Sequence, residues 1–239
     1  MIDVMLHGWA SSHASWQPLC SHLPEHKAHF ISLPGHNGFS DQGSINQQLM
    51  DIEAPYLLYA WSLGSLLAID HALSHPEKVA GLVLFSPIAC FIANNHWPHA
   101  MPKAIFEQFR HRFFKKSSPD YRYFRLLAAS GSQSPREHAE LLAQLDDSLP
   151  LPSLAGLQMG LEQLENQDMI HLLSELSMPV LLITGTQDAL VPVESVIDLS
   201  KRIKQVEYSA LEDVGHLPHV IAPQACARII SQWKVNALV

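Results

Sequence analysis

Cysteine is scarce in this chain, and the three that occur are odd in number and far apart: Cys20, Cys90 and Cys226. Such a set cannot form a disulfide framework, and it contains none of the short spacings of zinc sites. We therefore expect unpaired thiols that pack in the interior of a protein from a reducing compartment, and we expect no metal site.

Long apolar runs and an excess of positive charge are also missing. No stretch approaches the ~20 apolar residues that a membrane-spanning helix needs. The N-terminus lacks the basic region of a signal peptide. The formal net charge of −8 argues against general nucleic-acid binding. We expect a soluble cytoplasmic protein, a monomer, with neither a nucleic-acid nor a membrane partner.

Apolar residues make up 47% of the 239-residue chain and charged residues 16%, as in compact globular proteins. This length suits one core domain with an inserted subdomain. Short apolar runs alternate with helical patterns, which predicts an α/β fold with a mainly parallel sheet. The predicted strands are 2–6, 28–33, 56–60, 79–85, 179–184 and 206–210. The predicted helices of the core are 14–23, 44–51, 63–74, 193–203 and 223–235.

The segment 89–175 shows no strand-like alternation. Its apolar residues recur at intervals of three or four, as in Leu154, Leu157, Leu161 and Leu164, and this spacing is typical of helices. We predict a helical cap, or lid, over 89–175 and a core formed by 1–88 and 176–239. Most apolar side chains of the cap should pack its helices together, and some should face a cleft.

Ser62 lies at a predicted corner between a strand and a helix. The sequence Ala-Trp-Ser-Leu-Gly at 60–64 differs only at Ala60 from the G-x-S-x-G nucleophile elbow. Small flanking residues are needed there, because a nucleophile on so sharp a turn has a strained backbone that large neighbours would block. Serines also begin many helices as N-caps. The elbow alone leaves both interpretations open.

Asp188 and His216 follow two further predicted strands. The order serine, aspartate, histidine is that of the α/β-hydrolases, and the ends of parallel strands are where open sheets bind ligands. Taken singly, Asp188 could cap a helix that begins near Pro192, and His216 could be one surface histidine among 15. Together with Ser62 they predict a catalytic triad.

His7 and Gly8 close the first predicted strand. In α/β-hydrolases a His-Gly turn at this point presents a backbone N–H group to the oxyanion of the reaction. We predict that the N–H groups of Trp9 and Leu63 form this oxyanion hole. The alternative is an ordinary tight turn.

Charge is unevenly distributed along the chain. Residues 101–136 hold only two acidic side chains, and 137–175 hold eight acidic side chains without a lysine or arginine. Such blocks often mark interaction surfaces, although a solvated helix face is the simpler interpretation. The basic residues of the first block are Lys103, Arg110, Arg112, Lys115, Lys116, Arg122, Arg125 and Arg136.

Short segments over nearly the whole chain carry a family resemblance, among them Leu-His-Gly-Trp at 6–9, Trp-Ser-Leu-Gly at 61–64, Trp-Pro at 97–98, Gly-Leu-Glu at 160–162 and Gly-His at 215–216. With the triad and the cap, the chain resembles the bacterial pimeloyl-[acyl-carrier protein] methyl ester carboxylesterases of biotin synthesis. The resemblance implies an α/β-hydrolase fold of about six strands. The usual N-terminal strands are missing, so the strand at 28–33 should form a sheet edge.

The resemblance also implies site residues. A substrate-binding stretch of the cap corresponds to Phe124, Arg125, Leu126, Leu127 and Ala128, which would act with Trp9, Ser62, Leu63 and His216. Cap arginines of the family hold the phosphopantetheine phosphate and the acidic carrier protein. Arg136 falls at a matching place, and Arg110, Arg112, Arg122 and Arg125 are expected to act from shifted positions. The departures at Ala60 and Ser65 and in the arginine pattern bear on substrate more than on reaction.

The implied activity is that of a serine carboxylesterase, which forms an acyl-enzyme on Ser62 with His216 as the base and Asp188 as its partner. It requires no metal or organic cofactor, and its partner is the acyl-carrier protein that bears the ester. Two alternatives stay open. One is a broad-specificity short-chain carboxylesterase or a related α/β-hydrolase, and the other is a non-catalytic binding protein of the same fold.

Overall fold

A six-stranded sheet, parallel throughout, lies at the centre of the computed structural model, which describes residues 1–24, 28–115, 118–147 and 149–238. The strands follow the order β2-β1-β3-β4-β5-β6. Their bounds are β1 Ile2–Leu6, β2 Ala28–Ile31, β3 Tyr56–Trp61, β4 Val79–Phe85, β5 Val180–Gly185 and β6 Val206–Leu211. The predicted strands are confirmed to within two residues, and the strand predicted at 28–33 lies at an edge of the sheet.

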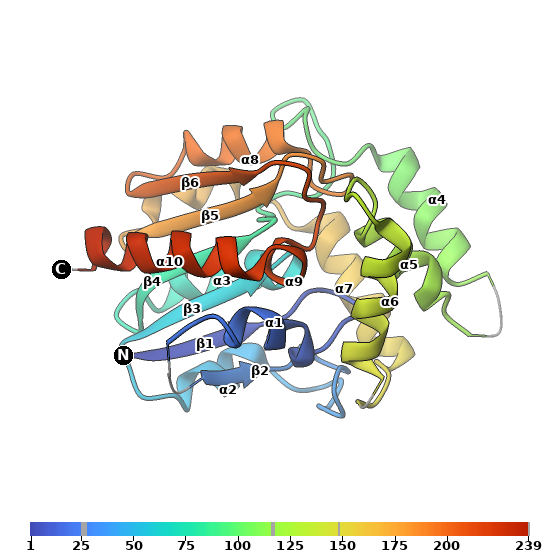
Figure 1. Cartoon of the computed structure of the whole chain (residues 1–239), viewed down its shortest axis with the longest axis horizontal. Helices are drawn as coiled ribbons and strands as arrows, with labels where there is room; N and C mark the ends of the chain where they lie inside the picture. The colour runs from blue at the N-terminus through green and yellow to red at the C-terminus, as the bar shows by residue number, and fades with distance from the viewer. Residues whose placement is uncertain (25–27, 116–117, 148, 239) are drawn as a thin grey trace.

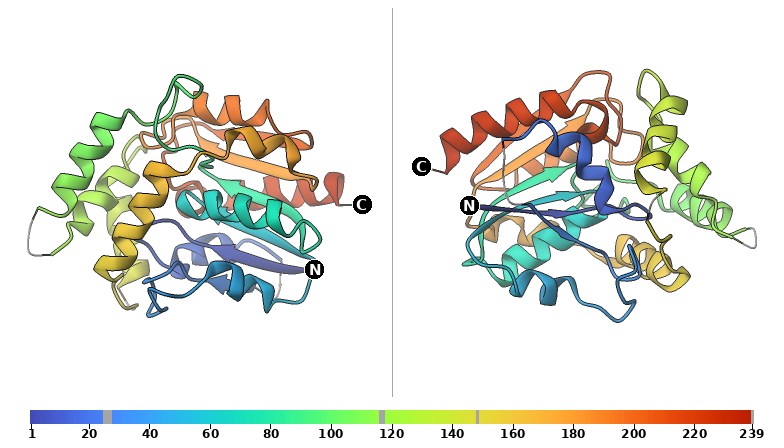
Figure 2. Two further views of the ribbon diagram at one scale, coloured as in Figure 1. Left: turned by 180° about the vertical axis from the view of Figure 1, so that it is seen from behind. Right: turned by 60° about the horizontal axis from the view of Figure 1, so that its bottom comes forward.

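Helices cover both faces of this sheet (Figures 1 and 2). The core helices are α1 Gln17–Cys20, α2 Ile45–Met50, α3 Leu63–Ser74, α8 Val193–Ser200, α9 Pro218–Ile221 and α10 Pro223–Ala237. A single helix over 14–23 was the wrong prediction. A 3-10 turn, His13–Trp16, precedes α1 instead, because Pro18 lacks the N–H group that would continue one helix and is favoured in a first turn.

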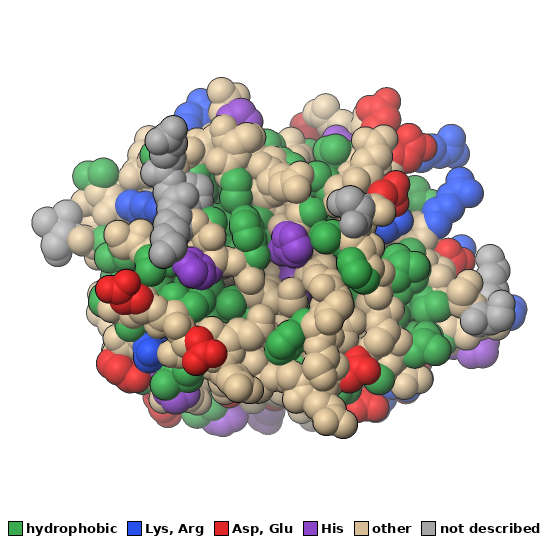
Figure 3. Space-filling view, turned by 90° about the horizontal axis from the view of Figure 1, so that it is seen from below, with side chains coloured by type: hydrophobic (Ala, Val, Ile, Leu, Met, Phe, Trp, Pro, Cys, Tyr) green, Lys and Arg blue, Asp and Glu red, His purple; other side chains and the backbone are tan. Residues whose placement is uncertain are grey.

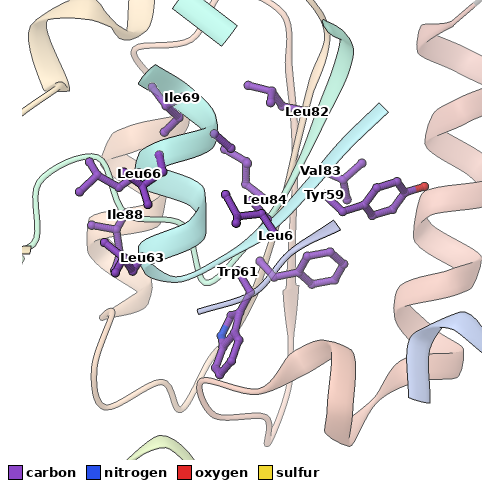
Figure 4. Packing of buried hydrophobic residues seen from close by; sticks show 14 of the residues in the cluster. Leu6, Tyr59, Trp61, Leu63, Leu66, Ile69, Leu82, Val83, Leu84 and Ile88 are labelled. Carbon is purple, nitrogen blue, oxygen red and sulfur yellow. The ribbon is translucent and has the colours of Figure 1, made fainter. Parts of the chain in front are cut away.

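The central strands are apolar on both faces because both faces are covered. Every residue of β3 and of β5 is buried. In Figure 4, Leu82 and Leu84 lie on the side of the strands that α3 covers, and Tyr59 and Val83 lie on the opposite side. Full burial of one such side chain stabilises the fold by about 1.5–3 kcal/mol. The sheet is therefore a rigid support for the loops at its ends.

The connection from β4 to β5 contains the cap helices, α4 Lys103–Phe113, α5 Tyr121–Ala128, α6 Pro135–Asp146 and α7 Leu154–Asn166, followed by the 3-10 helix η2 Ile170–Glu175. The helices α4 to α7 lie beyond one end of the sheet (Figure 1). Side-chain caps fix the start of two of them: Asp120 accepts from the N–H of Tyr123, and Ser153 from that of Gly156. The cap boundaries at 89 and 175 stay a prediction. No helix in the described ranges has the length and apolar character to cross a bilayer.

Candidate active site

Ser62 occupies the sharp turn between β3 and α3. Its backbone lies in a strained region, with φ 55° and ψ −122°, and its side chain makes no cap hydrogen bond to the helix. Ser62 therefore stands at the N-cap position of α3 but does not cap the helix with its side chain. A Cβ at Gly64 would lie 2.5 Å from the carbonyl oxygen of His7, so only glycine fits there. The hydroxyl of Ser65 donates to the Ser62 carbonyl oxygen at 2.6 Å and supports the turn.

Ser62, His216 and Asp188 form a continuous chain of hydrogen bonds. The Nδ1 atom of His216 lies 2.8 Å from Oδ2 of Asp188, and its Nε2 atom lies 2.9 Å from Oγ of Ser62. Since a carboxylate only accepts, Nδ1 carries the hydrogen and Nε2 accepts from the serine hydroxyl. The imidazole is thus held in the tautomer that a general base needs.

Asp188 is fixed by its own turn after β5. Its Oδ1 atom accepts from the N–H groups of Leu190 and Val191, each at 2.9 Å. One carboxylate oxygen therefore accepts hydrogen bonds from the turn, and the other accepts from His216. His219, the other histidine near the triad, is fully buried and has no hydrogen-bond partner for either ring nitrogen in the described structure.

Trp9 belongs to the loop after β1, and its side chain reaches into the cap. The indole Nε1 donates to the Leu157 carbonyl oxygen of α7 at 2.9 Å. Its ring packs on Phe109, Phe113 and Phe124, with centroids 5.6, 4.8 and 5.0 Å away. Across the residues that are described, the backbone N–H groups of Trp9 and Leu63 have no carbonyl partner. They are free to bind an acceptor, and their role as an oxyanion hole stays a prediction.

A cavity of about 290 Å³ opens onto Ser62 and His216. Its walls come mainly from α4, α5 and α7, and nearly all of the side chains that line it are apolar or aromatic, including Ile105, Phe106, Phe109, Phe124, Leu127 and Leu161. Away from the triad, Gln108 and Tyr123 add polar groups to the lining. Such a space fits an acyl chain rather than a charged metabolite.

The predicted substrate-binding stretch of α5 divides between two surfaces. Phe124 and Leu127 line the cavity, whereas Arg125 and Leu126 line a separate groove and Ala128 is buried among other side chains. Sequence reasoning missed the wall formed by Phe91, Met101 and the turn at 189–192. No motif marks these residues, since each reaches the cavity only through the packing of its loop.

The predicted basic patch also divides. On α4, Arg110 is paired with Glu165 at 2.6 Å, and the guanidinium of Arg112 lies 3.7 Å from the ring centroid of Tyr123. Arg122, Arg125 and Arg136 instead line a groove of about 300 Å³ between α5 and α6. Lys116 lies outside the described residues. In Figure 3, basic side chains gather at the cap end of the molecule, interspersed with acidic ones.

The thiols are unpaired, as expected: Cys20, Cys90 and Cys226 are free. Burial raises the pKa of the Cys90 thiol to about 11 and that of Cys226 to about 12, so both are protonated near neutral pH and are poor nucleophiles. Within the described residues, no group of three or more His, Cys, Asp or Glu side chains is arranged to hold a metal ion.

Comparison with known proteins gives consistent similarities. The family model described as alpha/beta hydrolase fold matches residues 4–223. The pimeloyl-[acyl-carrier protein] methyl ester esterase of Aeromonas hydrophila is 31% identical over 246 residues, which cover 96% of this chain and 94% of that protein. A protein of the same name from Aromatoleum aromaticum is 32% identical, over 95% of each chain.

Solved structures share the fold at lower identity. A thermophilic esterase from Thermogutta terrifontis superposes with a TM-score of 0.80 at 20% identity, covering 100% of this chain and 91% of that one. An esterase from Exiguobacterium antarcticum gives a TM-score of 0.82 at 17% identity, covering 98% and 91%. The arrangement of sheet and helices is therefore one that esterases use.

Proposed function

Because the chain belongs to the α/β-hydrolase superfamily and, within it, to the family of pimeloyl-[acyl-carrier protein] methyl ester esterases, we propose that it hydrolyses the methyl ester of a pimeloyl group carried by acyl-carrier protein. This reaction supplies a biotin precursor. The observation that carries the proposal is the hydrogen-bonded chain of Ser62, His216 and Asp188 at the mouth of an apolar cavity.

In the proposed mechanism the Ser62 hydroxyl attacks the ester carbonyl while His216 Nε2 accepts its proton. Asp188 stabilises the imidazolium that forms. As the tetrahedral intermediate collapses, the bond to the methoxy oxygen breaks and His216 protonates the departing methanol. Water activated by His216 then attacks the acyl-enzyme, which releases the free carboxylate and restores Ser62.

The oxyanion of each tetrahedral intermediate would be bound by the N–H groups of Trp9 and Leu63. Both groups lack a carbonyl partner in the described structure. Trp9 lies in the loop after β1, and Leu63 is the first residue of α3, directly after Ser62. One such donor contributes roughly 3 kcal/mol of transition-state stabilisation. No step in this scheme requires a metal or an organic cofactor.

The cavity and the arginine groove suit the two ends of the proposed substrate. The apolar lining would bind the methylene chain, and each buried methylene contributes about 0.8 kcal/mol. Gln108 and Tyr123 would donate to the thioester or amide groups that follow the chain. Arg122, Arg125 and Arg136 would bind the phosphate of the phosphopantetheine arm and the acidic carrier protein, because planar guanidinium groups match oxyanions in two hydrogen bonds.

The remaining parts of the proposal follow from the same assignment. The segment 89–175 would act as one cap unit that closes over the acyl chain. The protein would act as a monomer in the cytoplasm, where it would meet the carrier protein. The free thiols are compatible with that compartment.

The proposal is tested by giving the purified protein pimeloyl-[acyl-carrier protein] methyl ester and measuring release of methanol. We expect a higher kcat/KM than for a p-nitrophenyl butyrate control, and rescue of a biotin-requiring strain that lacks its own esterase. Ser62→Ala should abolish the hydrolysis of both esters. Hydrolysis of the p-nitrophenyl ester alone would favour a broad-specificity carboxylesterase.

A fluorophosphonate probe tests the third alternative. An enzyme should be labelled at Ser62, and Ser62→Ala should prevent the labelling. A protein that is not labelled and hydrolyses neither ester would be a binding protein of the same fold.

A further inference from the structure

We propose that His36 is a positioning residue for the hydrolysis: its imidazole holds the oxyanion loop, residues 7–10, in the conformation that presents the N–H group of Trp9. His36 does not line the active-site cavity and is not a member of the triad. It lies in the loop that follows the edge strand β2. The inference rests on the proposed function, because it assigns His36 a part in binding the oxyanion.

The hydrogen bonds of His36 fix both the direction and the tautomer of its ring. Its Nδ1 atom lies 2.9 Å from the carbonyl oxygen of Pro34, and its Nε2 atom lies 3.2 Å from the backbone N of Ala10. A carbonyl oxygen only accepts and an amide N–H only donates, so Nδ1 carries the hydrogen and Nε2 accepts. The ring is 1% exposed. His36 therefore joins the loop after β2 to the residue next to Trp9.

Ala10 has a backbone that needs such support. Its φ is 53°, in the left-handed region that favours glycine. A residue other than glycine in such a strained region is retained only where its surroundings hold it. The Ala10 N–H belongs to the peptide unit that begins at Trp9, so the bond to His36 restricts how Trp9 can rotate. Loss of the bond would let the loop relax away from its catalytic conformation.

His7 strengthens the same connection from the other side. Its Nδ1 atom donates to the carbonyl oxygen of Gly8 at 2.8 Å, and its Nε2 atom accepts from the N–H of Leu33 at 3.2 Å and from Nδ2 of Asn37 at 3.1 Å. The rings of His7 and His36 lie 5.4 Å apart. Two imidazoles with the same tautomer thus tie the loop after β1 to the loop after β2.

Both acceptor nitrogens must be unprotonated to do this. Burial lowers the pKa of His36 to about 4, and burial, followed by the neighbouring His36, lowers that of His7 to about 3. Each ring is therefore neutral at physiological pH, as the two hydrogen-bond patterns require.

The matched variants are His36→Met and His36→Gln. Methionine fills a similar volume without an acceptor, whereas the Oε1 atom of glutamine can reach the position of Nε2. With p-nitrophenyl butyrate, His36→Met should lower kcat about 100-fold with little change in KM, which is the effect of a lost oxyanion donor. His36→Gln should keep kcat within about tenfold of the wild-type value, as a restored hydrogen bond predicts.

The affinity for an aliphatic trifluoromethyl ketone is a second measurement, and it would not change if His36 had only a structural role. Ser62 adds to the carbonyl carbon of the ketone, His216 takes the serine proton, and the carbonyl oxygen becomes an oxyanion. Its affinity for His36→Met should fall by the same factor as kcat/KM. The proposal is overturned if His36→Met keeps both values within about threefold, or if the Met and Gln variants lose activity equally.

A measurement on the wild-type enzyme covers the case in which His36→Met does not fold. Nitrogen-15 spectra should show His36 with a protonated Nδ1 and an unprotonated Nε2, and the Ala10 amide should exchange slowly with solvent. A protonated Nε2 or a rapidly exchanging Ala10 amide would contradict the proposal. If wild-type protein neither hydrolyses esters nor reacts with a fluorophosphonate, the proposed function itself fails; active His36 variants would instead reject only the positioning role.

Discussion

The indole Nε1 of Trp61 donates a hydrogen bond of 2.9 Å to the carbonyl oxygen of His216. Trp61 directly precedes Ser62, so this bond ties the turn of the proposed nucleophile to the loop of the proposed base. A Cβ at Gly8 would lie 2.8 Å from Cε3 of the same indole, which places the ring against the oxyanion loop as well. One fully buried side chain thus adjoins three of the segments that form the site: the Ser62 turn, the His216 loop and the oxyanion loop.

Trp61→Phe should lower kcat about tenfold and leave KM almost unchanged. The variant keeps an aromatic ring but loses a hydrogen bond whose net contribution is about 1 kcal/mol, and the His216 loop is no longer fixed to the turn of Ser62. Steady-state kinetics on p-nitrophenyl butyrate measures the change. Trp97→Phe is the matched control, because the buried Trp97 indole has no hydrogen-bond partner in the described structure; an equal loss in that variant would contradict the assignment.

Asp188→Asn should lower kcat about 10⁴-fold. An amide can donate to Nδ1 of His216 and so favour the tautomer with a protonated Nε2, which cannot accept the serine proton. Labelling of Ser62 by a fluorophosphonate should slow in parallel. Asp198→Asn, on α8, removes a carboxylate that pairs with His99 and Lys201 and should retain full activity. A loss below tenfold in Asp188→Asn would remove Asp188 from the proposed triad.

Gly160→Ala should impair both folding and catalysis. The added Cβ would lie 2.4 Å from Cδ1 of Trp9 and 3.1 Å from Cδ2 of Leu63, so the methyl group would push against the two residues that carry the proposed oxyanion donors. Overpacking of this kind costs about 1–3 kcal/mol of unfolding free energy. Urea unfolding and kcat/KM measure the two effects. Gln158→Ala, exposed on the same helix, should change neither quantity, and a tolerated Gly160→Ala would show that the cap moves freely over the loop.

The double variant Arg122→Glu with Arg136→Glu should raise KM for the carrier-linked ester at least tenfold and leave p-nitrophenyl butyrate unaffected. Both side chains are exposed beside the groove, whereas Arg125 is also paired with the buried Asp146 at 3.5 Å and is better left intact. The difference should shrink as salt is added, because exposed charges are screened.

The control for this charge reversal is Arg228→Glu, on α10, with Lys201→Glu, directly after α8. These substitutions make the same change in net charge away from the cap. Equal losses on both esters in the groove variant would show that its arginines are structural.

The pH dependence of stability should include a contribution from His219. Burial, and then the neighbouring His216, lowers its pKa to about 3, whereas the unfolded chain binds the proton near pH 6.5. The unfolded state therefore holds more protons between these values, and the free energy of unfolding falls by up to about 1.4 kcal/mol per unit as the pH drops below 6.5.

Urea unfolding at pH 7.5 and pH 5.5 measures this contribution. His219→Leu should lose less stability between the two pH values than the wild type, and it should gain stability at pH 7.5 because two buried nitrogens without partners are removed. His22→Leu, at an exposed position, controls for the loss of a histidine. Identical pH dependence in His219→Leu and wild type would contradict the expectation.

The strands could be predicted because their signals are local, and the grouping of Ser62, Asp188 and His216 could be predicted because each of them follows a predicted strand. β1 and β4 have the predicted bounds, since each is a short apolar run that a turn residue ends. The chain order of Ser62, Asp188 and His216 predicted that these three residues act together. The helix predicted over 14–23 was wrong where Pro18 outweighed the apolar spacing, and α9 was missed because four residues are too few to show a period.

The walls of the cavity, and the polar side chains such as Asp146 and His36 that join distant loops, could not be predicted. Both depend on contacts between distant parts of the chain. Asp146 accepts from Ser12 at 2.5 Å and pairs with Arg125, yet in the sequence it is one acid in a charged block. His36 follows a Pro-Gly pair and so predicts only a turn. Nothing in the order of residues brings its ring to the backbone of Ala10.

Trp9 restricts how freely the cap of the enzyme can be exchanged. Its backbone belongs to the catalytic core, while its ring is enclosed by aromatic side chains of α4 and α5 and anchored to α7. Trimming the cap, or grafting another lid onto this scaffold, would strip the indole of its packing and disturb the loop beneath it. Any chimera that is meant to change acyl specificity must therefore exchange Trp9 together with the cap helices that carry its aromatic neighbours.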